Sequence, residues 1–261
     1  MPTLNRDGIT LHYLDEGKGP PLLLLHAFPL SVDSFWPQLQ SLTVNYRLIV
    51  PDQRGFGKSG VGEGASQMSM LAEDASAILD ACGISSAVVC GVSMGGYVAM
   101  ALLRLDPGRV RALVLIDTQA GADDEAGKAK REETARAVEQ QGTQVLVESL
   151  LPRLLSPRAK PEVKDRLRRD ILANSPRGVA AALRGMALRL DSRDILTRYG
   201  GPALVVIGEE DVITPPAKAE EMVKLIGGAK MARIPGAGHL SHLEAPEIFH
   251  RKLHAFLTQL Q

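Results

Sequence analysis

A short turn with a serine between two glycines constrains the fold of this chain more than any other feature. The run Val88-Val89-Cys90 leads into Gly91-Val92-Ser93-Met94-Gly95, and an apolar segment follows at residues 97–105. This order predicts a strand, a sharp turn and a helix, with Ser93 at the apex. Such a turn strains the backbone of the serine, and small neighbours two positions away let strand and helix pass closely. The hydroxyl would then stand clear of the packed sheet, beside the N–H groups of a helix N-terminus.

Length and charge favour a large single α/β domain and exclude several classes of partner. The chain has 261 residues, and its formal net charge is zero, so nothing global indicates nucleic acid or an anionic membrane surface as a partner. No apolar run is long enough to cross a membrane, and no signal peptide is visible. Cys82 and Cys90 lie in apolar segments, which indicates reduced, buried thiols in a cytoplasmic protein. We expect no metal site, because no cluster has the spacing of metal ligands.

Buried strands and helices alternate along most of the chain. After an alternating hairpin at residues 2–14, continuous apolar runs predict strands at residues 22–25, 46–50, 110–116, 202–208 and 229–234. Apolar residues at helical spacing predict helices at residues 31–42, 69–82, 215–226 and 247–260. This alternation implies a mostly parallel sheet covered on both faces, with ligands bound at the carboxyl ends of the strands.

The composition changes from residue 120 to about residue 194, where charged residues are frequent and runs of β-branched residues are absent. Helices are expected here at residues 128–141, 145–155, 161–173 and 178–190. We therefore predict a core domain made of residues 1–119 and 200–261, with a helical cap, or lid, inserted at residues 120–199.

The glycine-rich stretch after the second of these strands carries two patterns typical of nucleotide sites. Residues 55–60 satisfy G-x-G-x-x-G, but residues 61–65 continue as a loop where a dinucleotide site needs a helix. Gly57-Lys58-Ser59 also matches part of a P-loop, but Asp52 stands where that motif requires glycine. We expect no nucleotide and no cofactor.

A serine nucleophile needs an adjacent general base, and the base needs a carboxylate to orient it. His239 lies in a glycine-rich loop after the last predicted strand, and His242 is the alternative base nearer the following helix. Asp211 and Asp117 each follow a buried strand directly, so both are candidates for the acid. The alternative role for either carboxylate is a helix cap or a turn.

The turn at Ser93 resembles the nucleophile elbow of the α/β-hydrolase family. Four further stretches resemble loops of that family in the same order: His26-Ala27-Phe28-Pro29 and residues 52–59, 208–216 and 235–246. The resemblance covers residues 2–119 and 200–261. It implies an eight-stranded, mostly parallel sheet with helices on both faces and a helical cap insertion.

The resemblance also implies roles for individual residues. Ser93 would be the nucleophile, His239 the base and Asp211 the acid, although some members place the acid at the position of Asp117. The backbone N–H groups of Met94 and Phe28 would form the oxyanion hole.

The loop before Phe28 departs from the family pattern at one position. Ala27 stands where the family usually has glycine, and alanine resists positive φ, so this loop need not follow the usual path. We expect His26 to be structural.

A serine nucleophile excludes the aspartate-based dehalogenases and epoxide hydrolases of this fold. It implies an acyl-enzyme route on a small-molecule ester or lactone, carried out by a monomer or homodimer without nucleic acid or membrane. Enol-lactone hydrolases, carbon–carbon bond hydrolases and cofactor-free perhydrolases keep the same triad. A small-ligand receptor with an idle triad is the alternative from a different class.

The cap is expected to wall the substrate pocket. The expected lining residues are His26, Ala27, Trp36, Leu151, Leu155 and Met186, and further pocket or cap-core residues are Leu150, Leu154, Leu183 and Leu190. Residues 151–198 hold twelve Arg and Lys against five Asp and Glu. These cations either attract carboxylated substrates or form solvated helix faces balanced by the acids at residues 123–125 and 132–133, and we favour the second interpretation.

Overall fold

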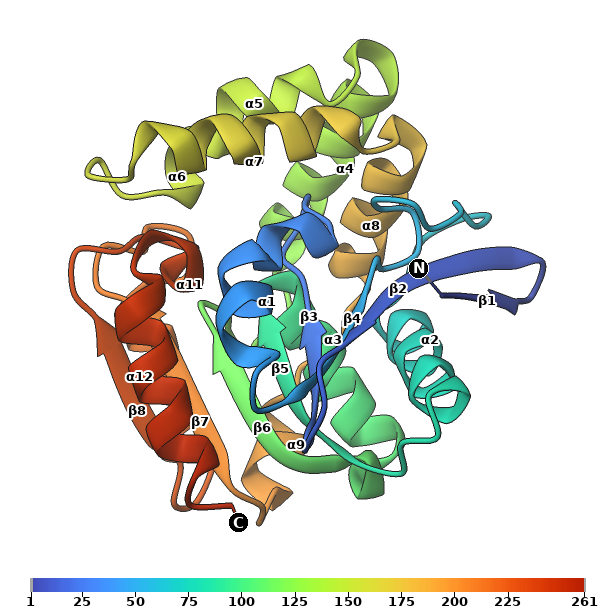
Figure 1. The fold of residues 1–261 in the computed structure, drawn as a ribbon. Helices are drawn as coiled ribbons and strands as arrows, with labels where there is room; N and C mark the ends of the chain where they lie inside the picture. Colours follow the sequence, from blue (N-terminus) through green and yellow to red (C-terminus); the bar gives the residue numbers. More distant parts are fainter. Residues whose placement is uncertain (1, 261) are drawn as a thin grey trace.

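A computed structural model describes residues 2–260 and contains a single eight-stranded sheet (Figure 1). The strands are β1 (Thr3–Arg6), β2 (Ile9–Glu16), β3 (Pro21–Leu25), β4 (Arg47–Pro51), β5 (Ala87–Val92), β6 (Val110–Ile116), β7 (Ala203–Gly208) and β8 (Lys230–Ile234). They lie in the order β1-β2-β4-β3-β5-β6-β7-β8. Only the β1–β2 and β2–β4 pairs are antiparallel. The predicted eight-stranded, mostly parallel sheet is confirmed.

Helices cover both faces of this sheet (Figure 1). On one face α1 (Trp36–Leu42) packs against α12 (Pro246–Leu257), and on the other lie α2 (Met68–Ala81), α3 (Met94–Leu105), α9 (Arg193–Arg198) and α10 (Pro216–Leu225). The short helix α11 (Ser241–Glu244) precedes α12. Double coverage explains why β5 and β7 are buried at every position. No helix within residues 2–260 combines the length and apolar character of a membrane span.

Five helices between β6 and β7 gather beyond the carboxyl ends of the parallel strands (Figure 1). They are α4 (Glu125–Gln141), α5 (Gln144–Ser149), α6 (Leu151–Leu154), α7 (Pro161–Ala173) and α8 (Pro176–Ala187), called here the cap helices. α4 packs along α8, and α7 packs on α5. The division of the chain into a core domain and a cap domain stays a prediction.

The end of α7 is tied to loops of the sheet by buried and half-buried hydrogen bonds. The Asp170 carboxylate accepts from the backbone N–H and the hydroxyl of Ser31, at 3.1 and 2.7 Å. The Asn174 amide donates to the Pro29 carbonyl at 2.9 Å and accepts from the Gly57 N–H at 2.7 Å. These bonds fix this part of the cap against the loops after β3 and β4.

Proline explains two places where the helices differ from the sequence prediction. The segment at residues 31–42 is a 3₁₀ turn, Val32–Phe35, followed by α1, and the segment at residues 145–155 is divided into α5 and α6. Pro37 and Pro152 each lie in the first turn of the second piece, where a missing N–H interrupts a continuous helix. The segment at residues 178–190 is shifted to α8, which ends at Ala187, and α9 and α11 were not predicted.

The turn between β5 and α3 requires glycine because backbone segments meet there. Ser93 has φ of 52°, in the left-handed region that L-residues rarely adopt. A Cβ atom at Gly91 would collide with the carbonyl oxygen of Gly95, and one at Gly95 would collide with that of Leu25. Strand, turn and helix therefore have the close approach that the sequence predicted.

We expect Gly95→Ala to destabilise the protein and to disrupt the turn that carries Ser93. Overpacking against backbone atoms costs about 1–3 kcal/mol, because a carbonyl group cannot move aside as a flexible side chain can. Gly227→Ala is the matched control, since a Cβ atom there has no heavy atom within 4 Å. Urea unfolding of both variants measures the effect, and equal stabilities would contradict the prediction.

Candidate active site

Ser93 and His239 come from distant parts of the chain and meet at the carboxyl edge of the sheet. Ser93 lies between β5 and α3, and His239 lies in the loop between β8 and α11. The Ser93 Oγ is 2.8 Å from His239 Nε2. The imidazole is buried, whereas Ser93 is half-buried and lines a cavity. A proton on Nδ1 leaves Nε2 free to accept from the serine hydroxyl, which is the arrangement that general-base activation needs.

Asp211 lies on the opposite side of the imidazole, in the loop after β7. Its Oδ2 is 2.8 Å from His239 Nδ1. The carboxylate also accepts from the backbone N–H groups of Ile213 and Thr214, at 2.8 and 2.9 Å, and from the Thr214 hydroxyl at 2.7 Å. Burial alone would raise the pKa of Asp211, but His239 and Thr214 hold this pKa below its usual value. The structure therefore places an ionised, well-oriented carboxylate on His239.

Asp117, the alternative acid, contacts loop backbone rather than the imidazole. It is fully buried, and it accepts from the Gly208 N–H at 2.8 Å and from the N–H and hydroxyl of Ser241 at 2.9 and 2.7 Å. Burial raises the pKa of Asp117 to about 7, against the opposing effects of His239 and these hydrogen bonds. Through these hydrogen bonds Asp117 holds the loop after β7 and the loop after β8 in place.

His242, the alternative base, faces the core. Its ring packs beside Phe35 and Phe249, with centroid distances of 5.5 and 6.2 Å. Both ring nitrogens are buried without a hydrogen-bond partner, and burial lowers the pKa of His242 to about 3. A neutral ring buried in the core at this position does not contact Ser93, so His242 is not placed to act as its base.

The two candidate oxyanion-hole residues flank Ser93. Met94 is the first residue of α3, where backbone N–H groups lack intrahelical acceptors. Phe28 follows β3 and lines the same cavity as Ser93. Within residues 2–260, positive φ at non-glycine residues occurs only at Asp7, Ser93 and Asp117, so Ala27 holds an ordinary backbone conformation. The alanine at this position is therefore accommodated without strain.

His26 lies beneath this loop, and its contacts are structural. It is fully buried, its Nε2 accepts from the Gln53 N–H at 3.0 Å, and its carbonyl accepts from the Gln53 amide at 2.8 Å. Burial lowers the pKa of His26. These bonds join the loop after β3 to the loop after β4, so they hold the segment that contains Phe28.

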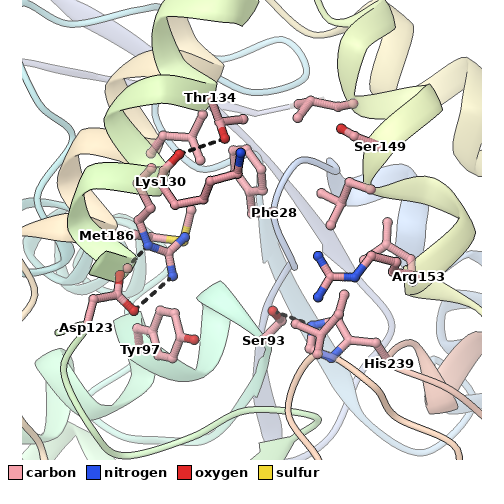
Figure 2. A pocket seen from close by; sticks show the side chains of 17 residues that line it. Phe28, Ser93, Tyr97, Asp123, Lys130, Thr134, Ser149, Arg153, Met186 and His239 are labelled. Atoms are coloured by element: carbon pink, nitrogen blue, oxygen red, sulfur yellow. Dashed lines mark hydrogen bonds and ion pairs between the residues drawn. The ribbon is translucent and has the colours of Figure 1, made fainter. Parts of the chain in front are cut away.

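A cavity of about 340 Å³ opens over Ser93 and His239 (Figure 2). Its walls come from α3, from the cap helices and from the loops after β3 and β7. The lining residues are Phe28, Ser93, Tyr97, Asp123, Gly127, Lys130, Arg131, Thr134, Leu146, Ser149, Leu150, Arg153, Leu154, Leu183, Met186, Ile213 and His239. The cavity is large enough for a small organic substrate and has a mainly apolar wall with a few charged groups.

Of the six expected lining residues, the structure places only Met186 on this cavity. Leu151 and Leu155 are buried in the cap, and Leu150 and Leu154 line the cavity instead, because α6 begins anew after Leu150. Trp36 lies outside, with the Arg166 guanidinium 4.2 Å from its ring centroid. His26 and Ala27 are buried behind Phe28 and do not line the cavity.

Tyr97 is a lining residue that the sequence analysis missed. It lies four residues after Ser93, and this helical spacing places it on the same side of α3, which was a usable signal. The cations of the wall gave no such signal, because they come from cap helices whose docking depends on tertiary contacts.

Most cap charges are paired within the protein. Arg184 on α8 contacts Glu132 and Glu139 on α4, at 2.9 and 2.6 Å. The carboxylate of Asp123 contacts both Arg131 and Arg189. These pairs agree with the interpretation of balanced helix faces. No group of three or more metal-ligating side chains lies together in residues 2–260.

Comparison with known proteins points to one family. Residues 20–246 match the family model described as alpha/beta hydrolase fold. The chain is 31% identical over 262 residues to 3-oxoadipate enol-lactonase 1 from Acinetobacter baylyi, covering 98% of this chain and 96% of that protein.

Two solved structures are similar over nearly their whole length. One is a thermophilic esterase from Thermogutta terrifontis with malate bound, at 38% identity and a TM-score of 0.95, covering 99% of this chain and 97% of that one. The other is the enol-lactonase from Burkholderia xenovorans LB400, at 27% identity and a TM-score of 0.91. The match covers 98% of this chain and 100% of that one.

We expect Asp117→Asn to change how stability depends on pH. The pKa of Asp117 is about 7 in the folded protein, against roughly 4 for an unfolded aspartate, so its contribution to folding is full below pH ~4 and is lost as the pH rises to about 7. The stability of the native protein relative to Asp117→Asn should therefore fall across this window. Unfolding from pH 4.5 to 8 measures it, with the exposed Asp80→Asn as control. Parallel profiles for the native protein and Asp117→Asn would contradict the raised pKa.

Proposed function

The chain belongs to the α/β-hydrolase fold family, and from this premise we propose that it hydrolyses a carboxylic ester or lactone through an acyl-enzyme formed on Ser93. The family and its enzyme relatives support the coarser class, a hydrolase. Ester or lactone hydrolysis on Ser93 is supported by two contacts of 2.8 Å, one from Ser93 Oγ to His239 and one from His239 to Asp211. Ser93 and His239 line a substrate-sized cavity. The relatives named as an esterase and as enol-lactonases support carbonyl substrates of this kind.

In the first half of the reaction, Ser93 Oγ attacks the carbonyl carbon while His239 Nε2 takes the hydroxyl proton. The ionised Asp211 stabilises the imidazolium that forms and holds its Nδ1–H in place. The negative charge that develops on the carbonyl oxygen is bound by the N–H groups of Met94 and Phe28. His239 then returns its proton to the alkoxide oxygen of the departing alcohol, leaving the acyl group on Ser93.

Water completes the reaction by the same route in reverse. His239 takes a proton from water, the hydroxide adds to the acyl carbon, and the Ser93 oxygen leaves with the proton that His239 returns. A lactone follows the same steps, except that its alcohol remains attached to the acyl chain.

The cap helices act as a lid in this proposal. Residues 120–199 form the insertion, and α4, α5, α6 and α8 supply most of the cavity wall above Ser93. A wall of this kind excludes bulk water from the acyl group and selects substrates by shape.

We expect Ser93→Ala to abolish turnover of p-nitrophenyl acetate and butyrate. Removal of the nucleophile should lower kcat by about 10⁴-fold or more, because base and oxyanion donors alone recover little of the rate. Release of p-nitrophenol and a thermal melt of the same sample measure activity and folding together. If the folded native protein shows no Ser93-dependent release, the proposal fails and a ligand-binding role on the same fold becomes the better account.

We expect Asp211→Asn to lower kcat by about 10⁴-fold, since an amide cannot hold the histidine in the required tautomer. Glu209→Gln, in the same loop, is the matched control and should stay within about twofold. The kcat values of both variants on p-nitrophenyl butyrate test this assignment. A kcat for Asp211→Asn close to that of the native protein would remove Asp211 from the triad.

A further inference from the structure

The cap helices supply three cations to the wall of the cavity, and two of them already have carboxylate partners. Lys130 Nζ lies 2.9 Å from a carboxylate oxygen of Glu133, and Arg131 contacts Asp123. Asp123 is the only acid of the wall, and Arg189 also contacts it, at 2.7 Å. The third cation is Arg153, whose guanidinium has no hydrogen bond or ion pair with any residue from 2 to 260.

Arg153 extends into the cavity from α6. Figure 2 shows its guanidinium on the side of the cavity where Ser93 and His239 lie. Leu150 and Leu154 line the cavity beside it, so residues 150, 153 and 154 form one face of the helix. An arginine on this face therefore presents its donors to whatever occupies the cavity.

We propose that Arg153 is a specificity residue that binds a carboxylate on the substrate, so that the preferred ester or lactone is anionic at the end remote from the reacting carbonyl. This inference rests on the proposed function. The guanidinium offers paired N–H donors whose geometry matches a carboxylate. Arg153 is exposed where it lines the cavity, so two parallel N–H bonds to the carboxylate, rather than exclusion of water, give such a pair its strength.

The remaining wall fits a substrate of this shape. Leu146, Leu183 and Met186 give it an apolar surface that suits the methylene groups between a carbonyl and a carboxylate. The single wall acid is already shared between two arginines, so it offers little repulsion to an incoming anion. Positive charge at the mouth also raises the local concentration of anionic substrates.

Two esters with a four-carbon acyl chain separate charge recognition from catalysis. Ethyl butyrate ends in a methyl group and monoethyl succinate ends in a carboxylate, and release of ethanol measures kcat/KM for both. Arg153→Gln should lower kcat/KM for monoethyl succinate by about 10- to 100-fold, the range for a lost charge-assisted hydrogen bond, and leave ethyl butyrate within about twofold. Added NaCl should lower the monoethyl succinate value in the native protein only.

Arg168→Gln is the matched control. Arg168 is also an exposed arginine of the cap, and its side chain has no hydrogen-bond or ion-pair partner within residues 2–260, but it does not line the cavity. It should leave both substrates unchanged. Equal values for native protein and Arg153→Gln on monoethyl succinate would overturn the proposal, and so would an equal loss on both substrates.

Binding of succinate, followed by calorimetry, distinguishes this inference from the proposed function. The native protein should bind succinate, and Arg153→Gln should bind it at least about tenfold more weakly. If Arg153→Gln weakens succinate binding but no ester hydrolysis depends on Ser93, the anion site is retained and the proposed esterase activity is rejected. If ester hydrolysis depends on Ser93 but Arg153→Gln binds succinate as well as the native protein does, the esterase activity is retained and the anion site is rejected.

Discussion

The carboxylate of Asp117 connects the two loops on which the candidate triad depends. One oxygen accepts from Gly208, at the end of β7, and the other accepts twice from Ser241, just beyond His239. Asp211 follows Gly208 by three residues and His239 precedes Ser241 by two, so the loops of both side chains are fixed relative to β6. A buried acceptor must be satisfied by such donors, because an unpaired one costs about 1–3 kcal/mol or more. The relative positions of Asp211 and His239 thus depend on a carboxylate that contacts neither side chain.

Strain at Ser93 is maintained by the same part of the sheet. A residue at φ of 52° costs about 1–3 kcal/mol and persists only where its surroundings leave no alternative. The Ser93 N–H donates to the Ile116 carbonyl at 2.9 Å, and the Thr118 hydroxyl donates to the Ser93 carbonyl at 2.8 Å. Residues 116–118 therefore hold the turn at Ser93 on one side and, through Asp117, the loops of Asp211 and His239 on the other.

The sequence predicted the sheet well because parallel, doubly covered strands leave a simple pattern, a continuous apolar run that ends in a polar loop. It could not choose between Asp117 and Asp211 on this pattern, since both follow such runs directly. Their difference lies in tertiary position: one carboxylate reaches backbone donors, and the other reaches an imidazole. Leu150 and Leu154 were predicted only as pocket or cap-core residues, and Leu151 and Leu155 were chosen as lining residues one position away. Pro152 restarts the helix there, and the pattern of leucines alone does not show where.

The number of charged residues in the cap does not predict the charge of the cavity wall, because ion pairing also depends on tertiary position. Arg184 and its two glutamates are 52 and 45 residues apart in sequence and meet only because α4 packs along α8. Of the twelve basic residues between 151 and 198, five are in ion pairs with carboxylates, and Arg153 is the one that lines the cavity. Among residues 2–260, Arg153 is therefore the arginine of the cavity wall whose guanidinium has no hydrogen-bond or ion-pair partner. Selectivity for an anion would then come from one side chain on a four-residue helix, whose position Pro152 determines.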